Sequence, residues 1–330
     1  MHAYIVNKVG GPEALELTEL SDPIPTVGQV KILIKAFGLN RAEAVTRMGG
    51  SGKAVKFPRV IGIECVGEVL ECPGGELTVG QKVCAAMGEM GRAYHGSYAE
   101  QVVVPSSNVF PIETKLDWVS LAAIPETYFT AWGCCFEVLK LDKVSKPKVV
   151  VRPGASALGI AVTQIVNHLG GHVIGITRSA HKAEKMKKAS MHKVIVSSNS
   201  VADQVRTEWP DGADGIIDTI VSKTSLRDNW KMRSKKGRVC LAGSLSSSYG
   251  NSESGNFLLA LLRPRVWFYN SGTISVKKDG RKIQDIINRV ETGHYQLRID
   301  GIFDFSELRE AHRLIDENAF VGKAVVKVGE

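Results

Sequence analysis

The feature of this 330-residue chain that most constrains its fold is a change of sequence period after Pro125. Beyond that point, short runs of β-branched and other apolar residues alternate with longer segments whose apolar residues recur every three or four positions. Strands that alternate with helices in this way form βαβ units around a parallel sheet, so we expect an α/β, doubly wound domain. The expected strands span residues 148–152, 172–177, 193–197, 215–220 and 238–243, with a sixth at the sheet edge near 266–271.

The residues before Pro125 follow a strand-and-turn pattern instead. Val30, Ile32 and Ile34 alternate with lysines, as in a strand that buries one face. A small antiparallel barrel suits this strand and the further strands expected at residues 3–9, 64–70, 82–87 and 97–104. Two helices, at 282–291 and 306–318, and a strand at 323–328 follow the α/β part, and we place them back with the β-rich part. The predicted domains are therefore residues 1–125 with 273–330, and residues 126–272.

Charge and cysteine content argue against several classes of protein. The chain has 42 Lys and Arg against 34 Asp and Glu, but the two signs are interspersed, so we expect no nucleic-acid partner. The one dense basic run is interpreted as a solvated helix face and comprises Lys182, Lys185, Lys187 and Lys188. The six cysteines form no CxxC pair, which excludes a zinc ribbon. With no signal-peptide pattern and no apolar run of about 18 residues, we expect a reduced, cytoplasmic protein that does not enter a membrane.

The sequence VVVRPGASALG, residues 149–159, indicates a nucleotide site. An apolar strand leads into a tight turn at Pro153 and Gly154, and a helix is expected to open at about Ala155. Such a turn directs backbone N–H groups at a pyrophosphate. Measured against GxGxxG, Ser156 replaces the middle glycine, so a generic turn between strand and helix is the alternative. The predicted cofactor-binding residues are Gly154, Ala155, Ser156, Ala157, Leu158 and Gly159.

The end of the second strand predicts which dinucleotide is bound. An NAD site offers a carboxylate here to the ribose 2′-OH, whereas an NADP site offers a basic residue to the 2′-phosphate. This chain has Thr177, Arg178, Ser179 and then Lys182, and no carboxylate. Arg178 is suited to a phosphate through charge-assisted hydrogen bonds. We therefore expect NADPH as the cofactor.

Six motifs in order make the whole chain resemble the medium-chain dehydrogenase/reductase superfamily, in its zinc-free quinone oxidoreductase and enoyl reductase branch. The resemblance implies a GroES-like catalytic domain, an inserted Rossmann domain and a C-terminal return to the first domain. It also implies a homodimer formed through edge strands of the Rossmann sheets. The motifs are the nucleotide turn with ITRS, GLNRAEA (38–44), FPRVIGIECVGEV (57–69), GSYAEQVVVP (96–105), AAIPETYFTAW (122–132) and VGKAVVKV (321–328).

The resemblance also implies that no metal takes part. Zinc-dependent relatives place a cysteine where this chain has Asn40, and a histidine–glutamate pair where it has Ile63 and Glu64. Asn and Ile cannot replace thiolate and imidazole as zinc ligands, and the four-cysteine structural zinc loop is missing. The expected chemistry is direct hydride transfer from the nicotinamide to an electron-poor carbon.

Several site residues are implied by their place in the family motifs. Asn40 is expected beside the nicotinamide, and Thr130 on its other side, as the catalytic residues. Their alternatives are an Asn that closes a strand and a helix-interior Thr bonded to its own backbone. The loop crossing the cofactor is expected to contain Ala242, Gly243 and Ser244, with ordinary turn chemistry as the alternative.

The proton donor stays open at this point. Many relatives have a tyrosine after the NRA motif, but residues 47–57 of this chain contain none. Lys53, Tyr94, Tyr128 and solvent are the alternatives.

The expected function is an NADPH-dependent reductase of quinones or α,β-unsaturated carbonyls. An enoyl reductase acting on a carrier- or CoA-linked acyl chain, and a non-catalytic NADPH-binding regulatory protein, are the alternatives.

Overall fold

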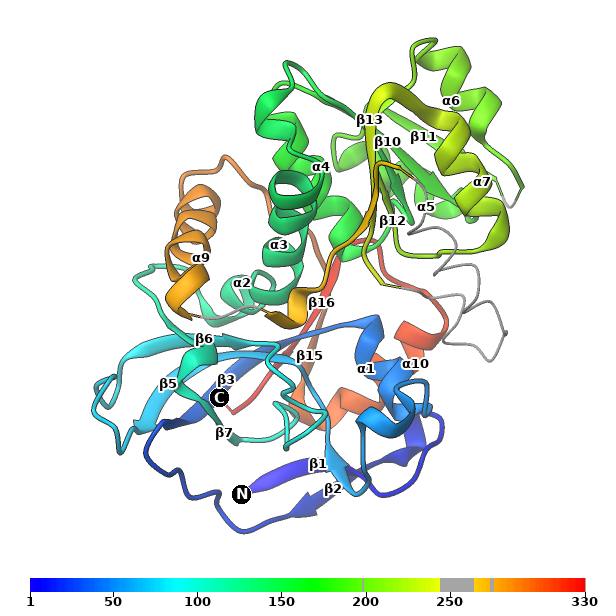
Figure 1. Ribbon diagram of the computed structural model, residues 1–330. Coiled ribbons are helices and arrows are strands. Elements are labelled where there is room, and N and C mark those ends of the chain that lie inside the picture. Colours follow the sequence, from blue (N-terminus) through cyan, green and yellow to red (C-terminus); the bar gives the residue numbers. More distant parts are fainter. Residues whose placement is uncertain (198, 244–263, 274–275, 330) are drawn as a thin grey trace. The chain divides into compact units, whose positions relative to one another are not determined.

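The computed structural model describes residues 1–330 except 198, 244–263, 274–275 and 330 (Figure 1). Contacts divide the chain into two compact units. Unit 1 comprises Met1–Phe129, Ser271–Gly293 and Ile299–Glu330, and unit 2 comprises Thr130–Asn270 and His294–Arg298.

Unit 2 contains a parallel sheet of six strands in the order β11-β10-β9-β12-β13-β14. This is the order 3-2-1-4-5-6 of the doubly wound dinucleotide fold, so the α/β prediction is confirmed. The strands are β9 (Lys148–Arg152), β10 (His172–Thr177), β11 (Lys193–Val196), β12 (Ala213–Asp218), β13 (Arg233–Leu241) and β14 (Val266–Phe268).

The central strands of unit 2, β9, β10 and β12, form because their apolar runs are buried on both faces. Val149, Val150 and Val151 of β9 are buried at the centre of the sheet. The strand β12 ends two residues before its predicted limit, because the carboxylate of Asp218 accepts the N–H groups of Ile220 and Val221 and turns the chain. The α-helices that begin in the described part of this unit are α4 (Ala157–His168), α5 (Ala180–Lys188), α6 (Ala202–Glu208) and α7 (Lys223–Met232).

The α5 helix corrects one expectation about the basic run. Lys185, Lys187 and Lys188 are exposed as predicted, whereas Lys182 is buried. Lys182 lies four residues before the buried Met186, and residues at this spacing share one helix face. The solvated face therefore begins after Lys182.

Unit 1 is the β-rich part predicted from the sequence. One sheet has the order β15-β16-β3-β5-β6-β8, with β7 also paired to β3, and a smaller sheet has the order β2-β1-β4. The strands are β1 (His2–Val6), β2 (Leu15–Glu19), β3 (Gln29–Leu39), β4 (Arg59–Val60), β5 (Glu64–Glu71), β6 (Lys82–Ala86), β7 (Gln101–Pro105), β8 (Val109–Pro111), β15 (Ile299–Asp304) and β16 (Lys323–Lys327).

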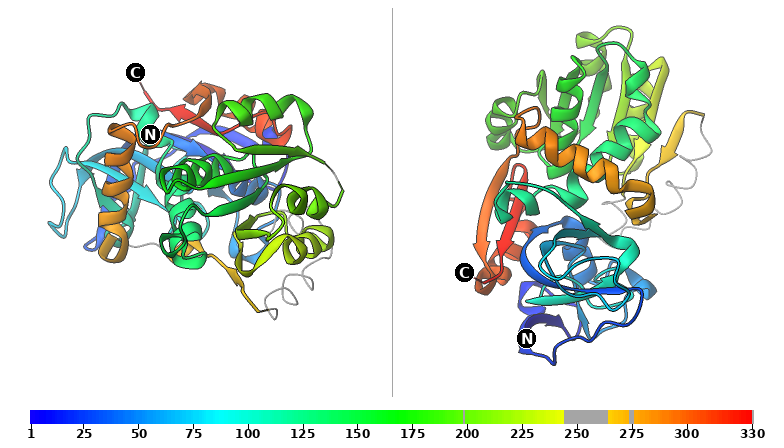
Figure 2. Two further views of the ribbon diagram at one scale, coloured as in Figure 1. Left: turned by 90° about the horizontal axis from the view of Figure 1, so that it is seen from above. Right: turned by 90° about the vertical axis from the view of Figure 1, so that its left-hand side faces the viewer.

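The C-terminal strands join the N-terminal ones in this sheet. Figure 2 shows β15 beside β16, and β16 pairs antiparallel with β3, for example Val326 with Phe37. The alternation predicted in β3 is confirmed, because Val30, Ile32 and Ile34 are buried in the core of this unit. Among the described residues of unit 1, five α-helices begin: α1 (Arg41–Arg47), α2 (Trp118–Ala122), α3 (Pro125–Trp132), α9 (Val276–Glu291) and α10 (Leu308–Asp316).

Candidate functional site

The nucleotide turn of unit 2 packs tightly against the next strand. The N–H group of Gly154 donates to the carbonyl of Ile176 in β10 at 2.8 Å. A Cβ at Gly154 would lie 2.7 Å from the Cα of Gly175, and a Cβ at Gly159 would lie 2.5 Å from the carbonyl of Gly154. Real Cβ atoms do not approach this closely, so both positions need glycine for space. The two predicted glycines hold the turn and the helix against the sheet.

The helix after the turn starts two residues later than predicted. Ser156 is its N-cap residue, because its Oγ accepts the N–H of Gly159 at 3.0 Å and donates to the carbonyl of Pro153 at 2.8 Å. The α4 helix therefore begins at Ala157 rather than at about Ala155. The N–H groups of Ala157 and Leu158 lie in its first turn, where no intrahelical acceptor exists. These two donors and the buried Ala155 complete the predicted turn.

At the end of β10 the predicted 2′-phosphate residues differ in exposure. Arg178 is exposed, and its guanidinium makes no hydrogen bond or ion pair to another described residue. Lys182 is buried, whereas Thr177 and Ser179 shape the bend through a 3.1 Å hydrogen bond between the N–H of Ser179 and Oγ1 of Thr177. His181, exposed in the first turn of α5, contacts Oγ of Ser179 at 2.7 Å.

The third predicted cofactor segment is described only in part. Ala242 donates its N–H to the carbonyl of Asp218 at 3.1 Å, and Gly243 has a φ of 113°, which favours glycine. Ser244 lies outside the described residues. These two described residues follow β13 directly.

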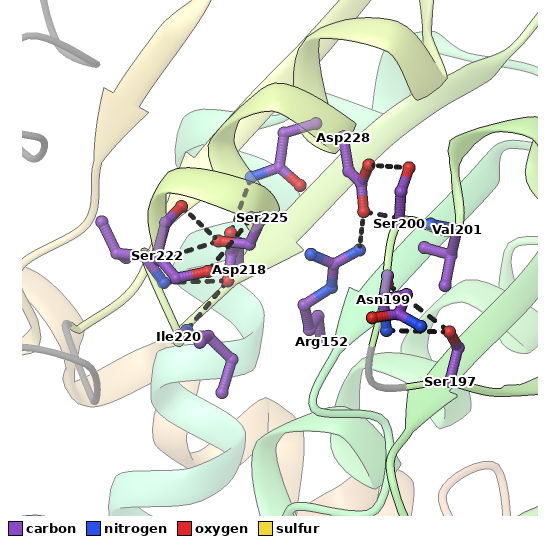
Figure 3. Close-up of polar contacts among 12 residues, drawn as sticks. Arg152, Ser197, Asn199, Ser200, Val201, Asp218, Ile220, Ser222, Ser225 and Asp228 are labelled. Carbon is purple, nitrogen blue, oxygen red and sulfur yellow. Dashed lines mark hydrogen bonds and ion pairs between the residues drawn. The ribbon is translucent and has the colours of Figure 1, made fainter.

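A polar cluster that the sequence analysis did not identify lies at the carboxyl ends of β9 and β12 (Figure 3). Nη2 of Arg152 lies 3.1 Å from Oδ2 of the fully buried Asp228 in α7. The same carboxylate accepts hydrogen bonds from Oγ of Ser200 at 2.6 Å and from the N–H of Val201 at 3.1 Å. In the sequence, the polar Arg152 at the end of the apolar run VVVR indicates a possible site, whereas no local pattern distinguishes Asp228. The Arg152–Asp228 pair therefore holds a guanidinium at the carboxyl ends of the strands, where doubly wound proteins bind ligands.

In unit 1, three residues of the GLNRAEA segment, Gly38, Asn40 and Glu43, have different structural roles. A Cβ at Gly38 would lie 2.4 Å from Cε of Lys323 and 2.5 Å from Oε1 of Glu64, so only glycine leaves room for both side chains. Asn40 precedes α1, and the side chain of Glu43 turns back to accept the N–H of Asn40 at 2.6 Å. Glu43 also accepts the N–H of Ile63 at 3.0 Å.

The side chain of Asn40 joins a cluster centred on the ammonium of Lys323. Nζ of Lys323 donates to Oε1 of Glu64 at 2.6 Å, to Oδ1 of Asn40 at 2.7 Å and to Oγ1 of Thr127 at 2.9 Å. These three acceptors use all three donors of an ammonium group. Nδ2 of Asn40 donates to the same Oε1 of Glu64 at 2.8 Å, which fixes the orientation of the amide. The N–H of Glu126 binds the second oxygen of Glu64 at 2.8 Å. This set of residues is called the Lys323 cluster below.

A second buried chain of polar groups starts at Glu43. Oη of Tyr98 lies 2.9 Å from Oε2 of Glu43 and 2.8 Å from Nε2 of His312. Nδ1 of His312 lies 3.1 Å from Nη1 of Arg47, and Nη2 of Arg47 lies 2.5 Å from Oδ2 of Asp316. The chain therefore links α1 to α10.

Burial sets the protonation of this chain. It raises the pKa of Glu43 to about 7, although hydrogen bonds from the N–H groups of Asn40 and Ile63 and the charge of Lys323 lower it. It lowers the pKa of His312 to about 3, with the charges of Arg47 and Arg41 acting in the same direction. His312 is therefore neutral at physiological pH.

The second predicted catalytic residue, Thr130, and the three candidate proton donors differ in how far they are exposed to solvent. Thr130 lies in α3, one turn after Thr127, and is buried, as is Tyr128. The hydroxyl of Tyr94 is buried without a hydrogen-bond partner among the described residues, and burial raises its pKa. Lys53 is exposed in the short 3₁₀ segment Gly52–Ala54. Of the three residues considered as proton donors, Lys53 is exposed, whereas the hydroxyl groups of Tyr94 and Tyr128 are buried.

The residues at the zinc-ligand positions do not fit a zinc ion. The nearest side chains to the carboxylate of Glu64 include an ammonium and an amide, neither of which is a zinc ligand of the usual nitrogen and sulfur type. Ile63, at the histidine position, is apolar and buried. Among the residues that the structure describes, no three His, Cys, Asp or Glu side chains gather as a metal site.

No described helix is both long and apolar enough to cross a membrane.

Two family models match this chain. One, described as "Alcohol dehydrogenase GroES-like domain", matches residues 26–114. The other, described as "Zinc-binding dehydrogenase", matches residues 157–281. The first covers much of the β-rich part and the second covers most of the described parallel sheet, so both predicted domain types are confirmed.

Curated proteins with similar sequences include reductases of small molecules. A 2-haloacrylate reductase of a Burkholderia species is 25% identical and covers 98% of both chains. A quinone oxidoreductase of Sus scrofa is 27% identical over 74% of this chain and 73% of its own. A synaptic vesicle membrane protein VAT-1 homolog of Danio rerio is 24% identical over 98% of this chain and 69% of its own.

Solved structures show the same fold. A mycobacterial protein complexed with NADPH has a TM-score of 0.83 at 22% identity, with 99% of each chain covered. The quinone oxidoreductase from Coxiella burnetii has a TM-score of 0.83 at 20% identity, covering 100% of this chain and 99% of its own. Taken with the sequence relatives, the two domain matches establish the family: the chain belongs to the medium-chain dehydrogenase/reductase superfamily, in its zinc-free quinone oxidoreductase branch.

Proposed function

We propose that this oxidoreductase uses NADPH to reduce a quinone or an α,β-unsaturated carbonyl compound without a metal ion. The observation that carries the proposal is the exposed Arg178 at the end of β10, where an NAD-specific site would have a carboxylate. The quinone oxidoreductase and 2-haloacrylate reductase among its relatives support this class of substrate.

The nucleotide turn has the groups that a dinucleotide needs. The N–H donors of Ala157 and Leu158, at the first turn of α4, would bind the pyrophosphate, helped by the positive end of the helix dipole. Arg178 would bind the 2′-phosphate as a fork of N–H donors. Ala242 and Gly243 would lie along the cofactor. The bound cofactor would supply a hydride from its nicotinamide ring.

Unit 1 would orient the reactants through Asn40, and Thr130 would do so from α3. The two N–H groups of Nδ2 of Asn40 face Oε1 of Glu64 at 2.8 Å and Oε1 of Glu43 at 3.4 Å, and Oδ1 receives one bond from Lys323, so a lone pair of Oδ1 is the group that the amide has left to offer. Asn40 would therefore accept a hydrogen bond and would not donate a proton.

We infer that solvent supplies the proton. The hydroxyl groups of Tyr94 and Tyr128 are buried, and burial raises the pKa of Tyr94. Lys53 is solvent-exposed in a short 3₁₀ segment and is the side-chain alternative. An enolate formed by hydride addition can take its proton from water, and a quinone reduced by single electrons needs no dedicated acid.

The proposal is tested by the oxidation of NADPH, with NADH in parallel, against an ortho-quinone, a 2-alkenal and 2-chloroacrylate. Turnover of any of these with preference for NADPH supports the proposal. Preference for NADH overturns the cofactor assignment. Bound NADPH without turnover of any of the three would favour a CoA- or carrier-linked enoyl substrate, or a binding protein without catalysis.

We also propose a homodimer formed through β14. This strand is the last of the described sheet, and the side chains of Trp267 and Phe268 are 38% and 42% exposed. Edge strands with exposed aromatic residues pair readily with a second copy. Light scattering of the wild type and of Phe268→Lys tests this, with a dimer expected for the first and a monomer for the second. A wild type that is monomeric at all concentrations contradicts it.

A further inference from the structure

We propose that the ammonium group of Lys323 is a built-in cation that positions Asn40 and Thr127, in a place that a zinc ion cannot occupy. The positioning of Asn40 for turnover rests on the proposed reductase function. The cation site itself does not, because it follows from the contacts within unit 1.

The contacts describe a built cation site. Three oxygens of different chemical types, a carboxylate, an amide and a hydroxyl, lie 2.6, 2.7 and 2.9 Å from Nζ. The side chains of Lys323 and Glu64 are 3% and 0% exposed, so their attraction is not weakened by solvent. A buried pair needs further hydrogen bonds to offset its desolvation. The amide of Asn40 and the N–H of Glu126 supply these at 2.8 Å each.

The surrounding backbone is shaped for the lysine stem. Gly38 lies under Cε of Lys323, where any Cβ would come within 2.4 Å. Gly38 and Lys323 come from β3 and β16, which are paired strands, since Leu39 opposes Ala324. The stem therefore crosses from one strand over the next, and its ammonium reaches Glu64 at the start of β5.

The cluster connects three elements that carry family motifs. Asn40 lies between β3 and α1, Thr127 lies in α3, and Glu64 opens β5. One ammonium therefore sets the distance between Asn40 and α3. Without it, the carboxylate of Glu64 keeps only N–H donors, and Oδ1 of Asn40 and Oγ1 of Thr127 lose their shared partner. Lys323 is thus a positioning residue and does not itself react.

The test replaces the lysine and returns its missing part in solution. Lys323→Ala removes the atoms that n-propylammonium contains. The melting temperature of this variant is expected to rise with n-propylammonium concentration, because the ion binds the native state. Propanol, which has the same shape and no charge, and sodium chloride are the controls. If neither the melting temperature nor turnover responds to the ion, and turnover equals that of the wild type, the proposal is wrong.

Turnover is the second measurement. Lys323→Ala is expected to lower kcat at least tenfold while the Kd of NADPH stays within twofold, and n-propylammonium is expected to restore part of kcat. An equal loss of kcat and NADPH binding would indicate general damage and would overturn the positioning role. A wild type that is inactive on every substrate tried would contradict the proposed function, whereas the melting-temperature response would still decide the cation site.

A double variant covers the case in which Lys323→Ala does not fold. Glu64→Gln with Lys323→Met removes both charges at similar volume, a replacement that buried pairs often tolerate. It is expected to fold, to show a shifted side-chain amide signal of Asn40 in a selectively ¹⁵N-Asn-labelled sample, and to gain no stability from n-propylammonium. An unchanged Asn40 signal with wild-type turnover would refute the proposal.

Discussion

Arg47 donates from Nη1 to Nδ1 of His312 across 3.1 Å, and this contact sets the direction of a buried hydrogen-bond chain. A guanidinium has only donors, so Nδ1 accepts and the imidazole proton is on Nε2. Nε2 then donates to Tyr98, which must donate its own proton to Glu43. A proton on Oε2 of Glu43 would make Tyr98 donate to Nε2 of His312 and would move the imidazole proton to Nδ1, where it faces Arg47, which cannot accept it. The chain therefore favours an ionised Glu43, while burial opposes it.

Glu43→Gln is expected to change how stability depends on pH. Burial raises the pKa of Glu43 to about 7 in the folded state, so between about 4.5 and 7 the folded state binds more protons and stability falls as pH rises. His312, with its pKa lowered to about 3, acts oppositely between about 3 and 6.5. In the wild type the two slopes offset each other where they overlap. In Glu43→Gln, stability should rise across pH 4.5–6.5, by up to about 1.4 kcal/mol per pH unit.

Urea unfolding at several pH values checks this, with His312→Gln as the matched variant. Its stability should fall over the range in which that of Glu43→Gln rises. Parallel curves for the wild type and both variants would show that neither group changes its protonation on folding.

Arg178→Ala is expected to raise the KM for NADPH about tenfold or more and to change the KM for NADH little. The exposed guanidinium would contact only the 2′-phosphate, and a charge-assisted contact contributes about 1.5–3 kcal/mol. Initial rates with both cofactors check this, with Arg227→Ala, at an exposed arginine of α7, as a control in the same unit. Equal effects on both cofactors would place Arg178 away from the 2′-phosphate.

Ser156→Ala should destabilise unit 2 by about 1 kcal/mol, because the N–H of Gly159 loses its side-chain acceptor. Ser156→Asp keeps an acceptor at this position and should retain stability, yet weaken NADPH binding through repulsion of the pyrophosphate. Thermal unfolding and fluorescence titration separate the two effects. Unchanged NADPH affinity in Ser156→Asp would mean that the pyrophosphate lies elsewhere.

Gly38→Ala should destabilise the protein by about 1–3 kcal/mol, since its Cβ would overlap the lysine stem and a backbone carbonyl 2.7 Å away. Combined with Lys323→Ala, the cost should be smaller than in the wild-type background, because Cε is then absent. A double-mutant cycle measures this coupling. Strict additivity would show that the stem does not press on Gly38.

Removal of metal ions should leave turnover unchanged. The ammonium of Lys323 already holds the oxygens of Glu64, Asn40 and Thr127. Dialysis against a chelator followed by an activity assay and zinc analysis checks this. Loss of activity that added zinc restores would contradict the description of the Lys323 cluster.

The architecture of unit 2 was readable from the sequence because its signals are local. The valines of β9 and the periodic apolar residues of α4 need only neighbouring positions to be interpreted. The helix α4 begins two residues after its expected start, because Ser156, at the position of a glycine in GxGxxG, caps the helix with its side chain. Lys182 was expected on a solvated face, although Met186 four residues later indicated a buried one.

The Lys323 cluster could not be predicted from local patterns. Glu64 and Lys323 lie 259 positions apart, and in a strand-like run such as VGKAVVKV a lysine usually points to solvent. The chain from Arg47 to Glu43 depends equally on His312, which is 265 positions from Arg47. The pairing of β16 with β3 brings Lys323 near Glu64, and the packing of α10 against α1 brings His312 to Arg47.

The distance along the chain between Glu64 and Lys323 has a consequence for synthesis on the ribosome. Glu64 leaves the ribosome long before the lysine that neutralises it, and all of Thr130–Asn270 is made in between. Until β16 is synthesised, the carboxylate of Glu64, which is buried in the folded protein, has no cation beside it and must stay hydrated. The first-made domain therefore completes its interior last, and the inserted domain can fold while its host is still open.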